Sequence, residues 1–515
     1  MADRERELST LLSSAILVMA GGIIGSAAKL GERVVIGRLL TPDAYGEVSI
    51  GLAFFTFTIT LALVGCTQGV SRFIPRYDSL EDRRGLLVSG MAITTVLSLV
   101  FAIGMFIGAG WLSAVFFETE AAVVFIQVLA VTLPFAVGFR MLIAAIRGCE
   151  NTLYRTIVND LVDPGLRIGL IGGLLLAGMG IVAAGIAYLI AAIVAFLVAL
   201  VFLHRLMPLV GAYRTHTKEL FIFSAPLAVS TVIGTLLTQT DTLMLGHFRS
   251  SYEVGMYNAA YPLAGGLLVV LSAFGFLYLP IISRLDSEGE RGAVNDIYAT
   301  TTKWVYIITF PAFLLFVVFP EGVIHTFFGQ NYTDAATALP ILALGFFASA
   351  TVGRDRETLS ALGSTSWIAI GNIVGLVVNV GINLVLIPRY GFIGASIASV
   401  ISLLGVHAVI CGVLAIQYDI TPLSPESTRT FLSLPLVLLP AGALVSPWIS
   451  ISMVTVLPFL VVTGLCSIAV VGLVDAFEAD DIVIIDLIED AAGFSIPLVR
   501  RWIPDSNTET GLSAD

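Results

Sequence analysis

Charged residues are scarce in this 515-residue chain, where Asp, Glu, Lys and Arg together make up only 12% of the sequence. A soluble protein usually carries about twice that share, because charges cover the surface that faces water. Lysine is the rarest of the four, occurring only as Lys29, Lys218 and Lys303, while the formal net charge is −11. This acidic balance argues against a nucleic-acid partner and is typical of proteins from high-salt organisms, such as a halophilic archaeon.

The usual signatures of catalysis and metal binding are also missing. The sequence has no Walker loop, no cluster of His and carboxylates with metal spacing and no Gly-x-Ser-x-Gly turn. Four single cysteines lack the close spacing of a disulfide framework or a zinc site: Cys66, Cys149, Cys411 and Cys466. We therefore expect no catalytic residue, no metal ligand and no cofactor, and interpret the protein as something other than an enzyme.

Long hydrophobic segments, by contrast, fill most of the chain. Hydrophobic residues make up 57% of it, and the mean hydropathy is +0.96. Stretches of about 20 mostly apolar residues can cross a hydrocarbon core of about 30 Å as helices. The sequence predicts an all-α polytopic membrane protein with about 14 spans, which begin near residues 10, 45, 85, 121, 156, 180, 219, 254, 302, 335, 366, 391, 430 and 452.

Basic residues gather in alternate loops between these segments. The positive-inside rule places such loops in the cytoplasm. They contain Arg72, Arg76, Arg83, Arg84, Arg147, Arg155, Arg205, Arg214, Lys218, Arg284 and Arg291. The intervening turns carry few cations, as at Glu118 and Glu120. We expect a multi-pass protein of the cell membrane with both termini in the cytoplasm.

One pattern of residues occurs twice, about 209 positions apart. The matching positions along the two copies are Gly37 with Gly246, Gly46 with Gly255, and Gly180 with Gly391. Such a repeat is typical of a transporter built from two copies of one unit. Because each copy contains an even number of spans, both should share one orientation, with a symmetry axis along the membrane normal.

This duplication divides the chain into four predicted parts. Residues 1–210 and 211–420 form two six-helix bundles related by a parallel repeat, and residues 421–475 add two transmembrane helices. Residues 476–515 form an acidic cytoplasmic tail. No polar segment outside the membrane is much longer than this tail, which leaves no room for a soluble catalytic domain.

Charged side chains within the spans are the first site candidates, because each costs at least roughly 2.5 kcal/mol on insertion scales. The first span carries Lys29, Glu32 and Arg33, and Arg38 follows just beyond it. Lys29 and Arg33 are four residues apart, so they share a helix face and could hold a phosphate in a cavity. The alternative is that Lys29 and Glu32 neutralise each other while Arg38 reaches the interface.

The seventh span carries a carboxylate, Asp241, close to Gln239. Under the repeat, Asp241 falls on Glu32, so each half has one acid at an equivalent position. Such a pair suits coupling to an ion gradient, or alternate pairing with cations as the two halves move. The alternative for Asp241 is a structural hydrogen bond to another helix.

The fourth and fifth spans add further charges. Span five contains Asp160, Asp163 and Arg167, and Pro164 is expected to bend the helix there. Asp163 and Arg167 are four residues apart and share a face. Arg140 lies near the cytoplasmic half of span four, where it could contact a phosphate or reach the membrane surface.

The eleventh span carries three asparagines, Asn372, Asn379 and Asn383. Intervals of seven and eleven residues place all three on one helical face. The repeat pairs Asp160 with Asn372 and Arg167 with Asn379. A polar stripe in the same helix of both halves indicates a shared central cavity, with hydrogen-bonded helix packing as the alternative.

Several of these segments together resemble a known family. They are Arg38-Leu39-Leu40-Thr41-Pro42, Tyr45-Gly46, Asp241-Thr242-Leu243-Met244-Leu245-Gly246, Val254-Gly255-Met256-Tyr257-Asn258 and Gly391-Phe392-Ile393-Gly394-Ala395. Over residues 8–475 the chain is similar to the polysaccharide exporter and O-antigen flippase branch of the multidrug/oligosaccharidyl-lipid/polysaccharide (MOP) superfamily. The resemblance implies two six-helix bundles around an alternately opening cavity, with two extra C-terminal helices.

Members of this family move polyprenyl-linked sugars from the cytoplasmic to the outer leaflet, often with coupling to an ion gradient. The resemblance implies a flippase for a polyprenyl- or dolichyl-phosphate-linked oligosaccharide, used in cell-surface polysaccharide or protein glycosylation. The head-group candidates are Lys29, Arg33, Arg38, Arg140, Arg167, Asn372, Asn379 and Asn383. The candidates for ion coupling or gating are Glu32, Asp160, Asp163, Gln239 and Asp241.

The expected partners follow from the same resemblance. They are the lipid-linked oligosaccharide, membrane lipid, and the glycosyltransferases or oligosaccharyltransferase that make or use the glycan. The energy source would be a Na⁺ or H⁺ gradient.

Three other functions stay open from the residues alone. A cation-coupled multidrug exporter of the related twelve-helix fold would favour an acidic pocket, whereas the predicted cavity is cationic on its N-terminal side. A glycan polymerase or ligase would need a large outer loop, and the outer turns here are short. A non-transporting scaffold for glycosyltransferases would act through the acidic tail.

Overall fold

A computed structural model describes residues 21–479 apart from 23 and 274, together with 481, 482, 485, 500, 502 and 503. Every regular element within these residues is a helix, so the predicted all-α class is confirmed. The beginning of the predicted first span and most of the acidic tail lie outside the described residues.

Contacts between residues divide the chain into two compact units. Unit 1 consists of Met1–Pro262, Phe328–Ala338 and Gly375–Ser399. Unit 2 consists of Leu263–Phe327, Leu339–Val374 and Val400–Asp515. The predicted boundaries near residues 210, 420 and 475 describe the sequence repeat, and they stay predictions.

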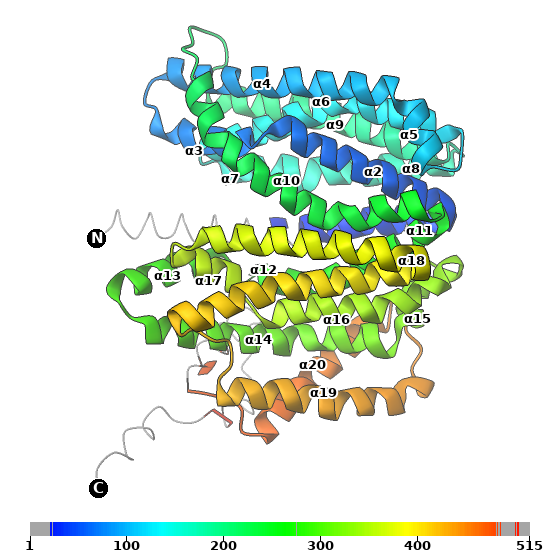
Figure 1. The fold of residues 1–515 in the computed structure, drawn as a ribbon, viewed down its shortest axis with the longest axis vertical. Coiled ribbons are helices and arrows are strands. Elements are labelled where there is room, and N and C mark those ends of the chain that lie inside the picture. The colour runs from blue at the N-terminus through cyan, green and yellow to red at the C-terminus, as the bar shows by residue number, and fades with distance from the viewer. Residues whose placement is uncertain are drawn as a thin grey trace. The chain divides into compact units, whose positions relative to one another are not determined.

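Unit 1 is built mainly from long helices (Figure 1). In chain order they are residues 24–39, α2 (Pro42–Leu63), α3 (Cys66–Phe73), η1 (Ile74–Arg76), α4 (Leu80–Ile107), α5 (Ala109–Phe116), α6 (Ala121–Gly148), α7 (Thr152–Thr156), the π-helical η2 (Ile157–Val162), α8 (Asp163–Leu176), α9 (Ile181–Leu206), α10 (Thr217–Phe248) and α11 (Ser251–Gly265). The short η3 (Gln330–Thr337) and the middle of α18 also belong to this unit.

Unit 2 begins at the end of α11 and contains the remaining helices. They are α12 (Leu268–Ala273), α13 (Gly275–Glu288), α14 (Arg291–Val318), α15 (Pro320–Phe327), α16 (Ala338–Thr351), α17 (Asp355–Ala361), the two ends of α18 (Thr365–Tyr418), α19 (Pro425–Val445), η4 (Ser446–Trp448) and α20 (Val456–Leu473). Within it, α19 and α20 both pack against α14.

Eleven of the described helices are long and apolar enough to cross a membrane, as expected of a multi-pass membrane protein. Two more predicted spans have a structural explanation. Gly391 breaks α18, whose 54 residues therefore hold two predicted spans. The fifth predicted span continues from α7 through the π-helical η2 into α8 without leaving helical structure. The total of about 14 stays a prediction, because the first span is described only from residue 21 on.

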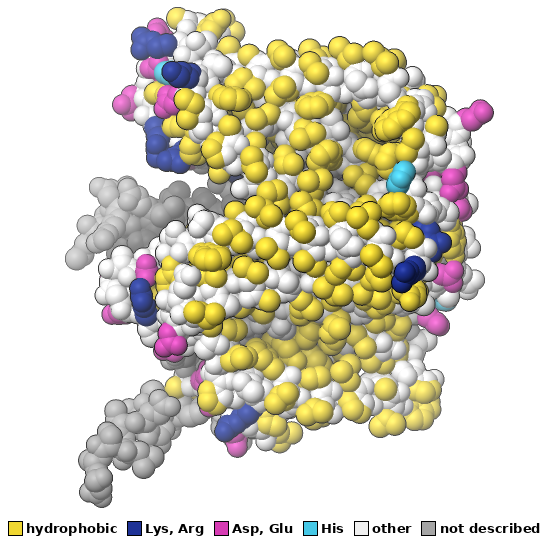
Figure 2. Space-filling view, in the orientation of Figure 1, with side chains coloured by type: hydrophobic (Ala, Val, Ile, Leu, Met, Phe, Trp, Pro, Cys, Tyr) yellow, Lys and Arg dark blue, Asp and Glu magenta, His cyan; other side chains and the backbone are white. Residues whose placement is uncertain are grey.

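The surface of the helices matches a lipid environment. On the face shown in Figure 2, hydrophobic side chains cover the middle of the helices in both units, and charged side chains gather toward the helix ends. On α4, exposed apolar side chains recur every three or four residues at Val96, Val100, Ile103 and Ile107. A stripe of this kind on a long helix faces lipid rather than water.

The two copies of the repeat adopt the same backbone conformation at equivalent glycines. Gly180, before α9, has φ 57° and ψ −146°. Gly391, between the two parts of α18, has φ 58° and ψ −135°. Side chains other than hydrogen rarely tolerate this region. The glycines therefore set the turn between spans five and six in one half, and between spans eleven and twelve in the other.

A second pair of equivalent glycines brings the two copies into contact within unit 1. A Cβ atom on Gly46 would overlap the carbonyl oxygen of Ser251, and one on Gly255 would overlap the backbone of Pro42. The first turns of α2 and α11 therefore touch backbone to backbone, in a reciprocal way that only glycine permits. Both turns lie at the helix ends that the sequence predicts to face the outside.

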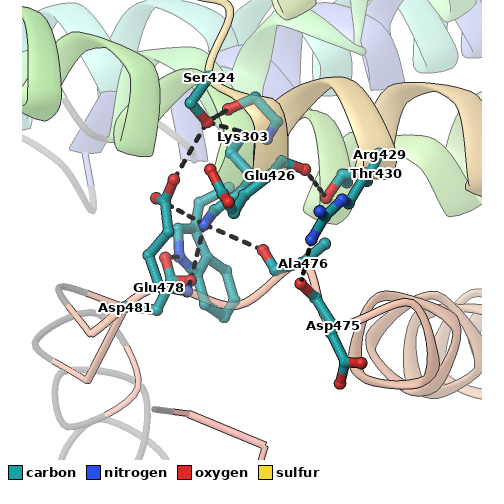
Figure 3. A network of polar contacts seen from close by, with 11 residues as sticks. Lys303, Ser424, Glu426, Arg429, Thr430, Asp475, Ala476, Glu478 and Asp481 are labelled. Atoms are coloured by element: carbon teal, nitrogen blue, oxygen red, sulfur yellow. Dashed lines mark hydrogen bonds and ion pairs between the residues drawn. The ribbon is translucent and has the colours of Figure 1, made fainter. Parts of the chain in front are cut away.

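The start of the tail is attached to unit 2 by buried charges (Figure 3). Lys303 of α14 has no exposed side-chain surface, and its Nζ lies 2.7 Å from Asp481 Oδ2 and 2.9 Å from Glu478 Oε2. Trp304 Nε1 donates a hydrogen bond to Asp481 Oδ1 at 2.7 Å. Ser424, which precedes α19, donates to Glu478 Oε1 at 3.1 Å. We call these five residues the tail clasp.

Candidate functional site

A cavity of about 220 Å³ lies among the helices of unit 1 and collects most of the predicted charges of the first half. Seven helical side chains with polar groups line it: Lys29, Glu32, Arg33, Arg140, Asp163, Arg167 and Tyr188. Thr56 and Thr132 add hydroxyls, and Phe55, Ile59 and Phe139 add apolar surface. The sequence predicts a central cavity shared by both halves. The lining of the cavity in unit 1 contains neither Arg38 nor the three asparagines, so the shared cavity stays a prediction.

Three helices bring the charges together, with Asp163 and Arg167 supplied by α8. The helix over residues 24–39 supplies Lys29, Glu32 and Arg33, while α6 supplies Arg140. The fifth predicted span changes from π-helical to α-helical geometry at Asp163, where Pro164 occupies the first turn of α8. A π-helical turn adds a residue to the helix and often occurs at functional sites.

Arg167 is the centre of an ion-pair network in this cavity. Its Nη2 lies 3.1 Å from Glu32 Oε2, and its Nη1 lies 3.3 Å from Asp163 Oδ2. Tyr188 of α9 donates a hydrogen bond of 2.5 Å to Glu32 Oε1, and the guanidinium carbon of Arg167 lies 4.8 Å from the Tyr188 ring centroid. Glu32 is thus paired with Arg167 on another helix, which replaces the alternative of neutralisation by Lys29.

Two cations of the cavity, Lys29 and Arg140, remain available to a ligand, while Arg33 forms a side-chain hydrogen bond with Tyr45. Lys29, Arg33 and Arg140 form no ion pair with a carboxylate among the described residues, while Arg167 engages both acids of the cavity. Lys29 and Arg140 are exposed, whereas Glu32 is buried. The open part of the cavity is therefore positive, and guanidinium and ammonium groups are the usual partners of phosphate.

The remaining candidates of the first half lie outside this cavity lining. Arg38 is exposed at the end of the first helix. Asp160, on the π-helical turn, accepts a hydrogen bond of 2.6 Å from Asn159 and lies beside Gly25 of the first helix. It belongs to the packing of these two helices rather than to the cavity lining.

Asp241 forms a second polar cluster in unit 1. It is 1% exposed, and its Oδ1 accepts hydrogen bonds from Asn379 Nδ2 at 3.0 Å and Asn383 Nδ2 at 2.6 Å. Its Oδ2 accepts from Tyr257 OH at 2.8 Å and from the Ser399 hydroxyl. Four neutral donors on three other helical segments therefore surround one carboxylate.

Two other candidates do not join this cluster. Gln239 is half-buried on α10 and takes no part in the hydrogen bonds that the described residues make to Asp241. Asn372 belongs to unit 2, and its buried Oδ1 has no hydrogen-bond partner among the described residues. Of the three asparagines predicted to share a face, the structure thus brings two together.

The two clusters have the same plan in both halves of the repeat. In each half a buried carboxylate contacts a hydroxyl of the sixth or twelfth predicted span. It also contacts polar side chains of the fifth or eleventh span, where Asp241 has two partners, Asn379 and Asn383. The equivalent pairs are Glu32 with Asp241, Arg167 with Asn379, and Tyr188 with Ser399. The first half places a guanidinium where the second half places a neutral amide, so no ion pair to Asp241 occurs within the described chain.

The side chains around Asp241 include oxygens that a cation could use. A buried carboxylate whose partners are all neutral keeps an uncompensated charge, which a cation or a proton would offset. The side-chain oxygens of Asp241, Asn379, Asn383 and Ser399 are hard ligands of the kind that bind such ions. Asn383 Oδ1 is buried without a hydrogen-bond partner among the described residues, and rotation of its amide would turn this oxygen toward Asp241.

Tyr188, Tyr257 and Ser399 are site residues that sequence reasoning missed. Apolar surroundings make single hydroxyls look unremarkable in a span, because tyrosine and serine are common there. The repeat offered one usable signal, since Tyr188 and Ser399 follow Gly180 and Gly391 at the same interval.

The fold is similar to that of several solved transporters. The structure titled "Lipid II flippase MurJ, inward closed conformation" matches with a TM-score of 0.67 and 14% identity, over 92% of this chain and 100% of that one. A structure titled "Inward-facing conformation of a multidrug resistance MATE family transporter of the MOP superfamily" matches with a TM-score of 0.66 and 16% identity, over 79% of this chain and 98% of that one. At such identities the likeness establishes the fold.

Sequence relatives include two proteins of Haloferax volcanii. One is named "Probable low-salt glycan biosynthesis flippase Agl15" and is 24% identical over 36% of this chain and 40% of its own length. The other, "Probable flippase AglR", is 25% identical over 32% of this chain and 35% of its own length. Each match thus spans less than half of the relative. A longer match, 22% identical over 70% of this chain and 76% of the relative, is to the uncharacterised membrane protein MJ1068 of Methanocaldococcus jannaschii.

Family profiles cover both copies of the repeat. The profile described as MatE matches residues 226–385. The profile described as "Polysaccharide biosynthesis protein" matches residues 11–286, which is more than half of the chain. The chain, with its cationic cavity and its duplicated membrane helices, therefore belongs to the polysaccharide biosynthesis protein family and has the fold of the MOP superfamily.

Proposed function

We propose that this protein moves a polyprenyl- or dolichyl-phosphate-linked oligosaccharide from the cytoplasmic to the outer leaflet. The step breaks no covalent bond, so it needs only a cavity that opens to each side of the membrane in turn. The relatives named as glycan flippases support this substrate class, and the solved lipid II flippase supports the fold for it.

The observation that carries the proposal is the excess of positive charge in the cavity of unit 1. Lys29, Arg33 and Arg140 line it without a carboxylate partner among the described residues. An isolated cation inside a membrane protein is costly, and a bound anion offsets that cost. A phosphate that links lipid to sugar is such an anion, whereas a cationic drug would be repelled.

The size of the cavity fits the phosphate end of the substrate. Its volume of about 220 Å³ lies below the range of roughly 300–1,000 Å³ that is usual for pockets of drug-sized ligands. It can accommodate the phosphate and its nearest atoms, and a complete oligosaccharide would need more room. The glycan would therefore extend beyond the cavity, while the polyprenyl chain stays in lipid.

The Asp241 cluster is the proposed site of ion coupling. Its carboxylate accepts hydrogen bonds from four neutral groups and has no ion pair within the described residues, so Na⁺ or H⁺ would complete it. Such an ion would bind only in conformations that keep these groups together. Ion binding would thereby favour one conformation over another.

The cellular setting follows from the same proposal. The protein would lie in the cell membrane with both termini in the cytoplasm, as its basic loops predict. Glycosyltransferases would supply the lipid-linked oligosaccharide on the inner side. A polymerase, ligase or oligosaccharyltransferase would use it on the outer side, because those reactions need the glycan already exposed there.

Reconstitution in liposomes tests the proposal. The native chain is mixed with a fluorescent dolichyl-phosphate-linked sugar, and a membrane-impermeant quencher reports how much of it reaches the opposite leaflet with and without a Na⁺ or H⁺ gradient. We expect gradient-dependent flipping. Arg140→Gln should lower the rate at least about tenfold, because a charge-assisted contact to phosphate is worth about 1.5–3 kcal/mol.

Two controls separate the alternatives. Arg205→Gln removes an exposed arginine from the last turn of α9, outside the cavity lining, and should flip like the native chain. Transport of a fluorescent cationic drug is measured in the same vesicles. Drug transport without sugar flipping would replace the proposal by multidrug export, and equal rates for the Arg140 variant and the native chain would remove the cavity from the mechanism.

A further inference from the structure

Two hollows follow one another along α10 in unit 1. The first, of about 920 Å³, lies between Phe73 of α3 and Phe223 and Leu227 of α10. The second, of about 360 Å³, lies between Leu61 of α2 and Val229 of α10. We call the surface formed by these five residues the α10 furrow. None of its lining residues is shared with the cationic cavity.

The furrow has the direction and composition of a lipid-binding surface. It follows α10 from Lys218 to Ile233, which corresponds to roughly 22 Å at 1.5 Å per residue. That length exceeds half of a hydrocarbon core of about 30 Å. From Ile222 onward the α10 side chains that line it are all apolar. A linear hydrocarbon chain lying along α10 would therefore stay in apolar surroundings from the polar end to mid-membrane.

Three exposed cations stand at the polar end of the furrow. The guanidinium carbon of Arg72 lies 4.5 Å from the Phe223 ring centroid, and that of Arg76 lies 5.9 Å from the Phe73 ring centroid. Lys218 lines the same hollow. The arginines are thus held against the rings that form the furrow walls, with their charges close to its entrance. The positive-inside rule places this end at the cytoplasmic surface.

One carboxylate lies among these cations and is already engaged. Glu219 accepts a hydrogen bond of 2.6 Å from Tyr77 OH. Burial, followed by the interaction with Glu219, raises the pKa of Tyr77 to about 12, so the phenol remains a donor at neutral pH. His216 stacks on Tyr77 and lies 2.9 Å from Asp82. The end of the furrow therefore keeps an excess of positive charge.

We propose that the α10 furrow binds a polyprenyl phosphate, with the isoprenoid chain along α10 and the phosphate at Arg72, Arg76 and Lys218. The inference rests on the proposed function, because it gives the phosphate and isoprenoid chain of that substrate an earlier binding surface, separate from the cationic cavity that the phosphate enters during flipping. An apolar furrow that ends in cations complements a molecule with one long apolar chain and one terminal anion. The furrow would collect the lipid carrier from the cytoplasmic leaflet before flipping.

Binding of dolichyl phosphate to the full-length purified protein in detergent tests the inference without transport. In Arg72→Gln/Arg76→Gln we expect about 30-fold weaker binding, since each cation near an anionic lipid contributes about one kilocalorie per mole. Arg205→Gln, which removes an exposed arginine from α9, should bind like the native chain. Dolichol, the uncharged alcohol, lacks the phosphate. It should therefore bind Arg72→Gln/Arg76→Gln and Arg205→Gln as it binds the native chain.

A second variant tests binding of the isoprenoid chain rather than binding of the phosphate. Leu227→Trp fills the first hollow and should weaken dolichol and dolichyl phosphate alike. Thermal unfolding of every variant checks folding, and Lys218→Gln is a further route to the phosphate site if the arginine variants unfold. Equal binding of phosphatidylglycerol, or displacement of dolichyl phosphate by inorganic phosphate alone, would overturn a site specific for polyprenyl phosphate.

The binding measurement and the flipping assay test separate claims. Native binding by Arg72→Gln/Arg76→Gln would overturn the furrow assignment even in a protein that flips its substrate. Loss of binding in this variant, together with no flipping by the native chain under any gradient, would leave the furrow standing and overturn the proposed function.

Discussion

Glu32 and Asp241 occupy equivalent positions of the repeat, but their charges are balanced differently. Glu32 pairs with Arg167 at 3.1 Å, whereas Asp241 accepts hydrogen bonds from neutral groups such as Asn379 and Asn383. At the scale of single residues, the first half has an internal cation, and on the proposed assignment the second half would take its cation or proton from solution. These two dependences can be measured separately.

Arg167→Gln should destabilise the protein by about 3–5 kcal/mol, because it leaves the buried Glu32 carboxylate without its cation. Unfolding in denaturant, followed by circular dichroism in detergent, measures the loss. The double variant Arg167→Gln/Glu32→Gln should recover part of it, since the uncompensated charge is then gone. Losses that simply add in the double variant would show that the two side chains do not depend on each other.

The second half should respond to ions instead. If Na⁺ binds at Asp241, raising its concentration to about 100 times the dissociation constant should stabilise the native chain by about 2.7 kcal/mol, seen as a higher Tm. Asp241→Asn should abolish this rise. Thr238→Val is a matched control, since its exposed hydroxyl donates only to backbone oxygens of α10. A Tm that responds to neither Na⁺ nor pH would exclude coupling at this cluster.

Sequence reasoning identified the cavity charges but not their pairing. Polar residues in a membrane segment stand out against an apolar background, which made Lys29, Arg33, Arg140 and Arg167 visible. The pairing of Glu32 with Arg167 joins residues far apart in the chain. Local spacing suggested Lys29 instead, because a helix pattern reports only neighbours on the same helix.

At the scale of helices, the contact between α2 and α11 depends on two glycines. A side chain at Gly255 would displace Pro42, so Gly255→Ala should separate the two helix ends that are predicted to face the outside. In a chain without native cysteines, Ser251→Cys should then react at least several-fold faster with a membrane-impermeant thiol reagent. Ser251 is buried in the described structure, which makes slow labelling the expected starting point.

Gly104→Ala is the control for this change. Gly104 lies within α4, where an added Cβ meets nothing within 4 Å, so labelling at position 251 should stay as in the native background. If Gly255→Ala leaves labelling unchanged while the protein remains folded, the glycine contact does not keep this side closed.

The sequence predicted which segments are helical, but it did not predict which partners a residue meets at its position along the helix axis. The intervals between Asn372, Asn379 and Asn383 predict one shared helical face. Eleven residues, however, correspond to about 16 Å along the axis, and Asn372 consequently lies in unit 2 while the other two reach Asp241 in unit 1. Periodicity defines the face and leaves the axial position open.

At the scale of the whole molecule, the tail clasp joins the start of the tail to α14. Lys303→Met would leave the buried Asp481 carboxylate without its cation, at a cost of about 3–5 kcal/mol, and would also remove the cation from the half-buried Glu478. We expect faster hydrogen exchange in α14 and in residues 475–482, and earlier cleavage there by protease. Arg429→Gln should change far less, because this exposed side chain bonds only to the Asp475 carbonyl among the described residues.

The outcome distinguishes a clasp from a passive contact. Equal exchange in Lys303→Met and Arg429→Gln would show that the buried charges do not hold the tail. Sequence reasoning placed the acids of this segment in a cytoplasmic tail but could not assign Lys303 to them, because their positions lie about 175 residues apart.

The tail clasp also affects how the alternative function, a scaffold for glycosyltransferases, should be tested. Deleting residues from Asp475 onward would remove both acids that pair with Lys303. Loss of surface glycan in that deletion would then reflect damage to unit 2 as well as lost recruitment. A truncation after Ile485 keeps Glu478 and Asp481, and it isolates the contribution of the remaining tail to any partner.

The first half of the repeat has Arg167 at the position where the second half has Asn379. The two halves therefore differ in where the charge that balances their buried carboxylate comes from. The first half contains its own positive charge and keeps it at any salt concentration. On the proposed assignment, the second half takes its positive charge from solution, so its stability follows the concentration of that ion. A membrane that separates two ion concentrations therefore acts on one half of the molecule and leaves the other unchanged.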